Sequence, residues 1–111
     1  MAPLADGVEL IAGARWEPRL GPLVMVGLGG IHAETLRDVR VALAPVDADG
    51  AEALLRSLRG APLLLGARGR PPLDLRACAE AIAALSRVAA AHPELAELEV
   101  NPLLALPRGA L

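Results

Sequence analysis

Hydrophobic positions in the first 44 residues predict three strands. Two short apolar runs, residues 8–14 and 22–28, are separated by residues 15–21, whose Pro and Gly are typical of a turn. The pair therefore predicts an antiparallel hairpin. The second run is apolar at consecutive positions, as expected of a central strand that is covered on both faces. Residues 39–44 alternate in hydrophobicity and predict a third strand, with Val39, Val41 and Leu43 on one face.

Two helices are predicted in the second half of the chain. Asp49 stands three residues before Glu52, a spacing typical of a capping box, and good helix formers follow as far as Gly60, a candidate C-cap. Residues 61–72 contain glycines and paired prolines, which predict an irregular connection. Residues 74–91 have apolar side chains at intervals of three and four, so they predict a longer amphipathic helix that begins after an Asp N-cap.

A last strand is predicted over residues 95–106, after His92 and Pro93 end the long helix. The elements then follow the order strand, strand, strand, helix, helix, strand. Helices segregated from a mainly antiparallel sheet are typical of a two-layer α+β domain. A length of 111 residues suits one modest core, so we expect residues 1–111 to form a single domain.

Composition and charge narrow the possible partners. The chain is 54% hydrophobic and 22% charged, which predicts a folded protein rather than a disordered one. Its net charge is −2, its arginines are scattered, and Trp16 is its only aromatic residue, so we do not expect a nucleic-acid partner. No apolar run approaches the roughly 18 residues of a membrane helix. The lone Cys78 lies on the apolar stripe of the long helix; we expect it in the core of a cytoplasmic protein.

Three polar residues alternate along the last predicted strand: Glu97, Glu99 and Asn101. Successive side chains of a strand point to opposite faces, so these three are expected to share one face. Carboxylate and amide oxygens suit Mg²⁺, which takes one or two protein ligands and completes its shell with water and phosphates. The same alternation is also the usual signature of a half-exposed strand, and the pattern alone favours that simpler interpretation.

The stretch GLGGI, residues 27–31, follows the second predicted strand. Glycines there permit close backbone approach and let N–H groups converge on an anion. The spacing is not a dinucleotide fingerprint, because His32 occupies the position of the third glycine. A tight turn at the strand end explains the glycines equally well, and Glu34 is either a ligand-orienting group or a surface carboxylate.

Taken together, residues 7–45, 54–74 and 95–107 resemble the ATP-grasp portion of ADP-forming acyl-CoA synthetases, relatives of the succinyl-CoA synthetase β subunit. The resemblance covers nearly the whole chain in the right order. It implies the C-terminal lobe of an ATP-grasp fold. It also implies a reaction in which ATP and ADP exchange a phosphoryl group with an enzyme histidine, coupled through an acyl phosphate to formation or cleavage of an acyl-CoA thioester.

The resemblance also implies roles for particular residues. An E-x-N strand lines the nucleotide site of ATP-grasp proteins and supplies Mg²⁺ ligands, which assigns metal binding to Glu99 and Asn101 and reverses the preference for a merely solvated face. A GLGG…E stretch lies near the phosphate end of that site. The implied phosphate-binding residues are Gly27, Gly29, Gly30 and Glu34. Relatives commonly carry an aromatic residue where this chain has His32.

Other parts of the family's machinery are not found in these 111 residues. The chain has no lysine, whereas a preceding lobe of the ATP-grasp unit contributes one in relatives. The CoA-binding domains and their phosphorylated histidine are missing too. We therefore expect the second half of an ATP-grasp domain, inactive alone, whose partners are a complementary lobe and a CoA-binding subunit or domains. The alternatives are a truncated, non-catalytic module that binds a partner protein, and a fragment with no independent role.

Overall fold

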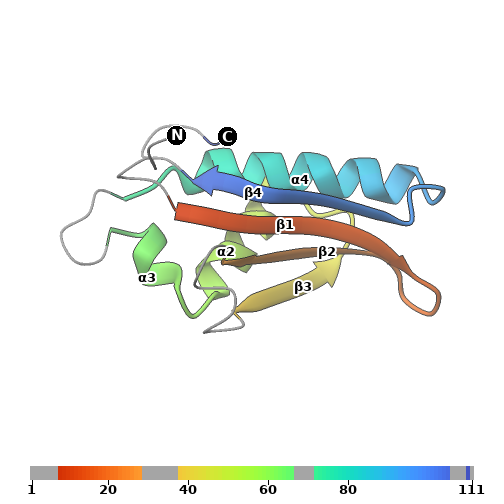
Figure 1. Cartoon of the computed structure of the whole chain (residues 1–111), viewed down its shortest axis with the longest axis horizontal. Helices are drawn as coiled ribbons and strands as arrows, with labels where there is room; N and C mark the ends of the chain where they lie inside the picture. Colours follow the sequence, from red (N-terminus) through yellow and green to blue (C-terminus); the bar gives the residue numbers. More distant parts are fainter. Residues whose placement is uncertain (1–7, 29–37, 67–71, 106–109, 111) are drawn as a thin grey trace.

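The structure of the chain, a computed structural model, describes residues 8–28, 38–66, 72–105 and 110. For residues 101, 102, 104 and 105 it describes the backbone alone. Within these ranges a sheet forms one layer and helices form the other (Figure 1). The predicted α+β class is confirmed.

Four antiparallel strands form the sheet, in the spatial order β3-β2-β1-β4. They are β1 (Val8–Glu17), β2 (Gly21–Leu28), β3 (Val39–Leu43) and β4 (Glu97–Ala105). The hairpin predicted from the first two apolar runs is confirmed, and its strands extend further toward the turn than the runs suggested. The chain returns for β4 only after the helices, so β4 pairs with β1 at the opposite edge from β3.

The long predicted helix is α4 (Leu75–Ala91), and Asp74 is its N-cap, with its carboxylate accepting a hydrogen bond from the Ala77 N–H at 3.0 Å. The shorter helix, α2 (Ala48–Ser57), begins earlier than predicted. Its N-cap is Asp47, whose Oδ1 accepts from the Gly50 N–H at 2.7 Å, so the predicted capping box at Asp49 was wrong.

The stretch predicted to be irregular contains a third, one-turn helix, α3 (Ala61–Leu64). Gly60 is the N-cap of α3 and not the C-cap of α2, which is Leu58. Pro62 fits because it lies in the first turn, where a backbone N–H has no intrahelical acceptor. None of the helices in the described ranges has the length and hydrophobicity needed to cross a bilayer.

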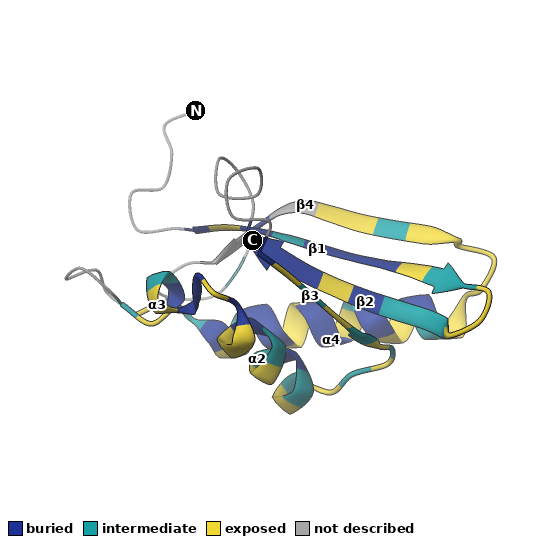
Figure 2. Ribbon diagram, turned by 90° about the horizontal axis from the view of Figure 1, so that it is seen from below, coloured by how far each residue is buried: buried dark blue, intermediate teal, exposed yellow. Residues whose placement is uncertain are grey.

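The core lies between the sheet and the helices, as the burial colours in Figure 2 show. Alternate residues of β1 and β2 meet the apolar stripe of α4 there, and the largest fully buried apolar side chains are Leu10, Val24, Val26, Leu28, Leu55, Leu64 and Ile82. Cys78 is also fully buried in this core, as predicted. Burial, and to a lesser degree the charge of Asp74, raises the pKa of its thiol to about 11, so it stays protonated and unreactive near neutral pH.

Asp38 joins the start of β3 to the turn between α2 and α3. Its side chain is fully buried, and its two carboxylate oxygens accept hydrogen bonds from the N–H groups of Arg59 at 2.8 Å and Gly60 at 2.6 Å. Its carbonyl oxygen also accepts from the N–H of Leu28 at 3.2 Å. Asp38 therefore fixes the end of β2, the beginning of β3 and the turn before α3 relative to one another.

The second face of the sheet has no helix over it in the described part of the chain (Figure 2). Apolar side chains of β2 and β3 remain exposed there, with 38% of Met25, 53% of Val41 and 60% of Leu43 accessible. β2 is central, as predicted, but the expectation that it is covered on both faces is wrong for these residues. We call this surface the open face.

Candidate functional site

Two rows of side chains cross the open face, because residues paired in an antiparallel sheet project on the same side. The first row is Val41, Met25, Gly13 and Glu99, and the second is Leu43, Leu23, Arg15 and Glu97. In both rows the β3 and β2 positions are apolar, whereas the β4 position is a glutamate. The open face is thus divided into an apolar half over β2 and β3 and an acidic half over β4.

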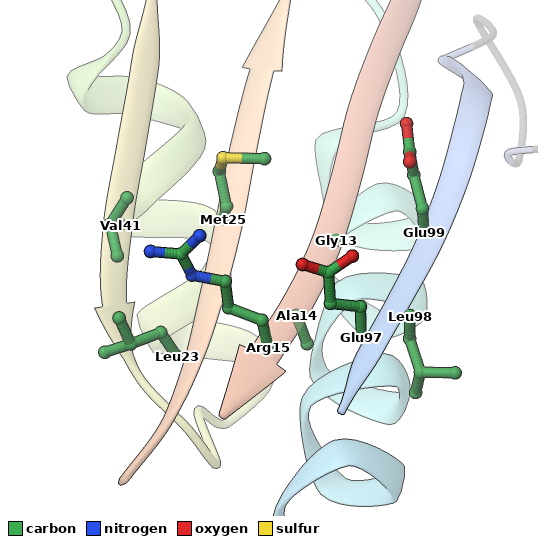
Figure 3. Close-up of a pocket in the computed structure, with 9 residues that line it drawn as sticks. All are labelled: Gly13, Ala14, Arg15, Leu23, Met25, Val41, Glu97, Leu98 and Glu99. Atoms are coloured by element: carbon green, nitrogen blue, oxygen red, sulfur yellow. The ribbon is translucent and has the colours of Figure 1, made fainter. Parts of the chain in front are cut away.

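A pocket of about 410 Å³ lies where the two halves meet (Figure 3). Its lining residues come from all four strands: Gly13, Ala14, Arg15, Leu23, Met25, Val41, Glu97, Leu98 and Glu99. Glu97 and Glu99 are both exposed and both line the pocket, so the prediction that they share a face is confirmed.

Gly13 forms the floor of the pocket between Met25 and Glu99 (Figure 3). A Cβ atom at this position would lie 3.1 Å from the backbone oxygen of Leu98 and 3.9 Å from the methyl carbon of Met25. Such contacts leave little room for a side chain, and a larger one would extend into the pocket. Glycine weakens a strand interior, and it often marks a site where a ligand approaches the backbone closely.

Asn101 lies in an irregular part of β4. Its neighbour Val100 pairs with Ala12, whereas Leu103 pairs with Leu10, so β4 carries one more residue than β1 between these two pairs. This arrangement is a β-bulge, so strand pairing establishes regular alternation along β4 only as far as Val100. The Asn101 side chain lies outside the described part of the structure, and its metal role stays a prediction. Pro102 was the available signal, since proline within a sheet occurs at edges and bulges.

Gly27 lies near the end of β2, where a Cβ atom would come within 2.9 Å of the backbone oxygen of Asp38. Close packing of β2 against the start of β3 therefore explains this glycine, and its phosphate-binding role stays a prediction. The other predicted phosphate-binding residues, Gly29, Gly30 and Glu34, lie outside the described residues, as does His32.

The acidic half offers carboxylate oxygens, which are the ligands that hard cations prefer. Within the described ranges no group of three or more His, Cys, Asp or Glu side chains forms a closed metal site. Two carboxylates beside an open pocket match the way in which Mg²⁺ is bound, through few protein ligands with positions left for water and phosphate oxygens. Glu97 and Glu99 lie beside Gly13, which has no side chain to occupy the pocket. They therefore suit Mg²⁺, which keeps some water and phosphate ligands, better than a cation whose ligands all come from the protein.

Arg15, Gly13 and the apolar residues of β2 and β3 were not identified as site residues from the sequence. The sequence pattern predicts Arg15 in a turn and Gly13 in an ordinary strand. An isolated glycine within a strand pattern was the signal for Gly13. The alternate positions of Leu23 and Met25 become informative only once pairing with β1 and β3 places them in the same rows as the glutamates.

Matches to known proteins cover the whole chain. The model of a family described as ATP-grasp domain matches residues 1–111. The β subunit of acetate–CoA ligase (ADP-forming) I from Pyrococcus furiosus is 39% identical over 111 residues. The 4-hydroxybutyrate–CoA ligase (ADP-forming) of Nitrosopumilus maritimus is 41% identical over 103 residues, 93% of this chain. The chain spans 47% of the length of the first relative and 15% of the second.

Solved structures also resemble this chain. The dinucleotide-forming acetyl-coenzyme A synthetase 1 of Ca. Korarchaeum cryptofilum, in complex with coenzyme A and Mg-AMPPCP, superimposes with a TM-score of 0.89 at 39% identity. The match covers 99% of this chain and 51% of that one, and the phosphohistidine segment of that complex points towards the nucleotide-binding site. PH1788 from Pyrococcus horikoshii matches with a TM-score of 0.83 at 30% identity, over 98% of this chain.

Proposed function

Because the chain belongs to the ATP-grasp domain family, we propose that its open face binds the magnesium complex of ATP or ADP, as the C-terminal lobe of an ADP-forming acyl-CoA synthetase. The observation that carries this proposal is the division of the open face into an apolar and an acidic half around one pocket. A nucleotide has the same division, with a flat base at one end and chelated phosphates at the other.

The apolar half suits the base and sugar. Leu23, Met25 and Val41 present exposed or half-exposed apolar surface next to the pocket, and covering it with an aromatic ring would remove that surface from water. Methionine adapts its shape easily and makes favourable sulfur contacts at aromatic rings. We place the base over these residues.

The acidic half suits the metal and the phosphates. Glu99 and Asn101 would hold Mg²⁺, with Glu97 beside them, while Gly27, Gly29, Gly30 and Glu34 belong to the phosphate end of the proposed site. When bound, the metal would neutralise charge on the phosphate oxygens, which favours phosphoryl transfer. The residues of this chain orient the nucleotide and supply its floor, and Gly13 lets it approach the backbone of β1.

A complete reaction requires more than this lobe. Phosphoryl transfer depends on several groups acting together, and removing part of such a set usually abolishes most of the rate. The isolated chain is therefore expected to show no acyl-CoA synthetase turnover. The proposed partners are a complementary ATP-grasp lobe and a CoA-binding subunit, in line with a relative described as a β subunit. Mixing the chain with such partners should produce ATP- and CoA-dependent thioester formation, and no gain over the separate parts would contradict the proposed assembly.

Replacing Glu99 with glutamine tests the metal assignment. Glutamine keeps the size of the side chain but removes its negative charge, so we expect the affinity for Mg²⁺-ADP to fall by about tenfold or more, since contacts with charged groups contribute about 1.5–3 kcal/mol. The measurement is an NMR titration of backbone amides with Mg²⁺-ADP. Glu80→Gln, an exposed position on α4, makes the same charge change on the other layer and should leave the affinity unchanged. Equal binding by wild type and Glu99→Gln would remove Glu99 from the metal site.

A second candidate function is a non-catalytic module that binds a partner protein through the open face. The exposed Val39, Val41 and Leu43 favour it, because contiguous apolar surface often marks a protein interface. The same titration separates the two functions. A chain that ignores Mg²⁺-ADP but binds a partner equally well with or without Glu99→Gln would have this second function.

A further inference from the structure

Arg15 is the one basic residue among the nine that line the pocket. It occupies the middle of the second row, paired with Leu23 of β2 on one side and Glu97 of β4 on the other. In Figure 3 its guanidinium extends over β2 toward Met25 and Val41, whereas the Glu97 carboxylate extends toward Gly13. The backbone of Arg15 thus lies between the two halves of the open face, while its guanidinium lies over the apolar half.

The fold itself gives little reason for an arginine at this position. The side chain is 61% exposed, and its ion pair with Glu17 Oε2 spans 3.8 Å. Exposed pairs of this kind contribute at most about 1 kcal/mol. Other residues that favour strands would keep the β1 backbone in the same conformation, so the guanidinium contributes little to the stability of the fold.

A positive charge in a pocket that two carboxylates also line changes what the pocket attracts. Its charge opposes the entry of a bare divalent cation, since like charges repel across a shared pocket. The same guanidinium attracts a polyphosphate and offers a planar fork of N–H donors to phosphate oxygens. The metal complex of a nucleoside diphosphate is itself an anion, so Arg15 favours the complex over the free metal.

We propose that Arg15 is a phosphate ligand that makes the open face select metal-bound nucleoside polyphosphates over free divalent cations. This inference rests on the proposed function, and it adds a residue and a selectivity to it. The exposed Arg15 side chain has room to turn from the apolar half toward phosphate oxygens bound over the acidic half. There it would hold those oxygens, while its charge lowers the occupancy of Glu97 and Glu99 by metal alone.

The proposal requires opposite effects on two ligands. For Arg15→Gln we expect about tenfold weaker binding of Mg²⁺-ADP, since a charge-assisted contact is lost. Binding of Mg²⁺ alone should become about two- to fivefold tighter, since a repelling charge is removed. Arg15→Lys keeps the charge but not the fork, so it should bind Mg²⁺ alone like wild type and Mg²⁺-ADP with intermediate affinity.

The experiment is a pair of amide NMR titrations at constant ionic strength, one with MgCl₂ alone and one with ADP in excess MgCl₂. Arg87→Gln, at an exposed position on α4, makes the same change in net charge away from the open face and should match wild type in both. Opposite shifts in the two affinities support the proposal. Unchanged affinities, or a loss of both, overturn it while the proposed function stands. If wild type itself does not bind Mg²⁺-ADP, the proposed function fails and this inference fails with it.

Discussion

Asp38→Ala is expected to lower the free energy of unfolding by about 2–5 kcal/mol, because it leaves two backbone N–H groups without their acceptor in the interior. Those groups belong to Arg59 and Gly60, and the carboxylate that they contact is fully buried. Water cannot replace it without opening the turn before α3. Since small domains have only about 5–15 kcal/mol of stability in total, much of the chain would be unfolded under mild denaturation.

Urea unfolding followed by circular dichroism measures this effect. The matched control is Asp49→Ala, since the Asp49 side chain is 85% exposed and its partner Arg76 is also on the surface. That variant should unfold at nearly the wild-type urea concentration. Asp38→Asn keeps the shape of the side chain but removes its charge. The asparagine oxygen can accept from one N–H group, but its NH₂ group would face the other N–H. Most of the loss in unfolding free energy should therefore remain. An Asp38→Ala variant as stable as wild type would show that the turn does not depend on this carboxylate.

Gly13→Val is expected to weaken binding of Mg²⁺-ADP by at least about tenfold, equivalent to about 1.4 kcal/mol. Its Cβ would lie 3.1 Å from the Leu98 oxygen, and its methyl groups would fill the floor of the pocket between Met25 and Glu99. The loss would come from excluded volume, because no charge changes. The effect on stability should be only about 1 kcal/mol, since valine favours strands while the tight Cβ contact opposes it.

Amide NMR titration of Gly13→Val with Mg²⁺-ADP measures the affinity, and urea unfolding measures the stability of the same sample. Ala84→Val adds the same kind of side chain at an exposed position on α4, away from the pocket, and should bind like wild type. If Gly13→Val binds Mg²⁺-ADP normally and remains folded, the nucleotide does not lie over β1 as proposed.

Local signals predicted most of the fold. The hairpin, α4 with its Asp74 cap, and the strand that contains Glu97 and Glu99 follow from alternation, helical spacing and capping chemistry, which act between residues close in sequence. The sequence predicts too late a start for α2 because Asp47 and Asp49 are both good N-caps, and only the folded backbone shows which of them accepts the hydrogen bond. The short α3 depends on the contacts of Gly60, which bring it next to Asp38.

Less of the candidate site could be predicted from the sequence. Alternation predicted that Glu97 and Glu99 share a face, and that is confirmed. It could not show that the face also carries Met25 and Arg15, because strand pairing sets these neighbours across more than 70 residues of sequence. Nor could it show that the apolar residues of β2 are uncovered on one side, since an apolar run looks the same whether protein, ligand or water covers it.

The most direct test of nucleotide binding at the open face is to replace Mg²⁺ with paramagnetic Mn²⁺, which also prefers oxygen ligands, and to record which amide signals broaden in the presence of ADP. Binding at the open face predicts that signals of Gly13, Arg15 and Glu99 broaden first, while those on the exposed side of α4 stay sharp. Broadening centred on the acidic residues Asp49 and Glu52 of α2, or no selective broadening at all, would contradict it.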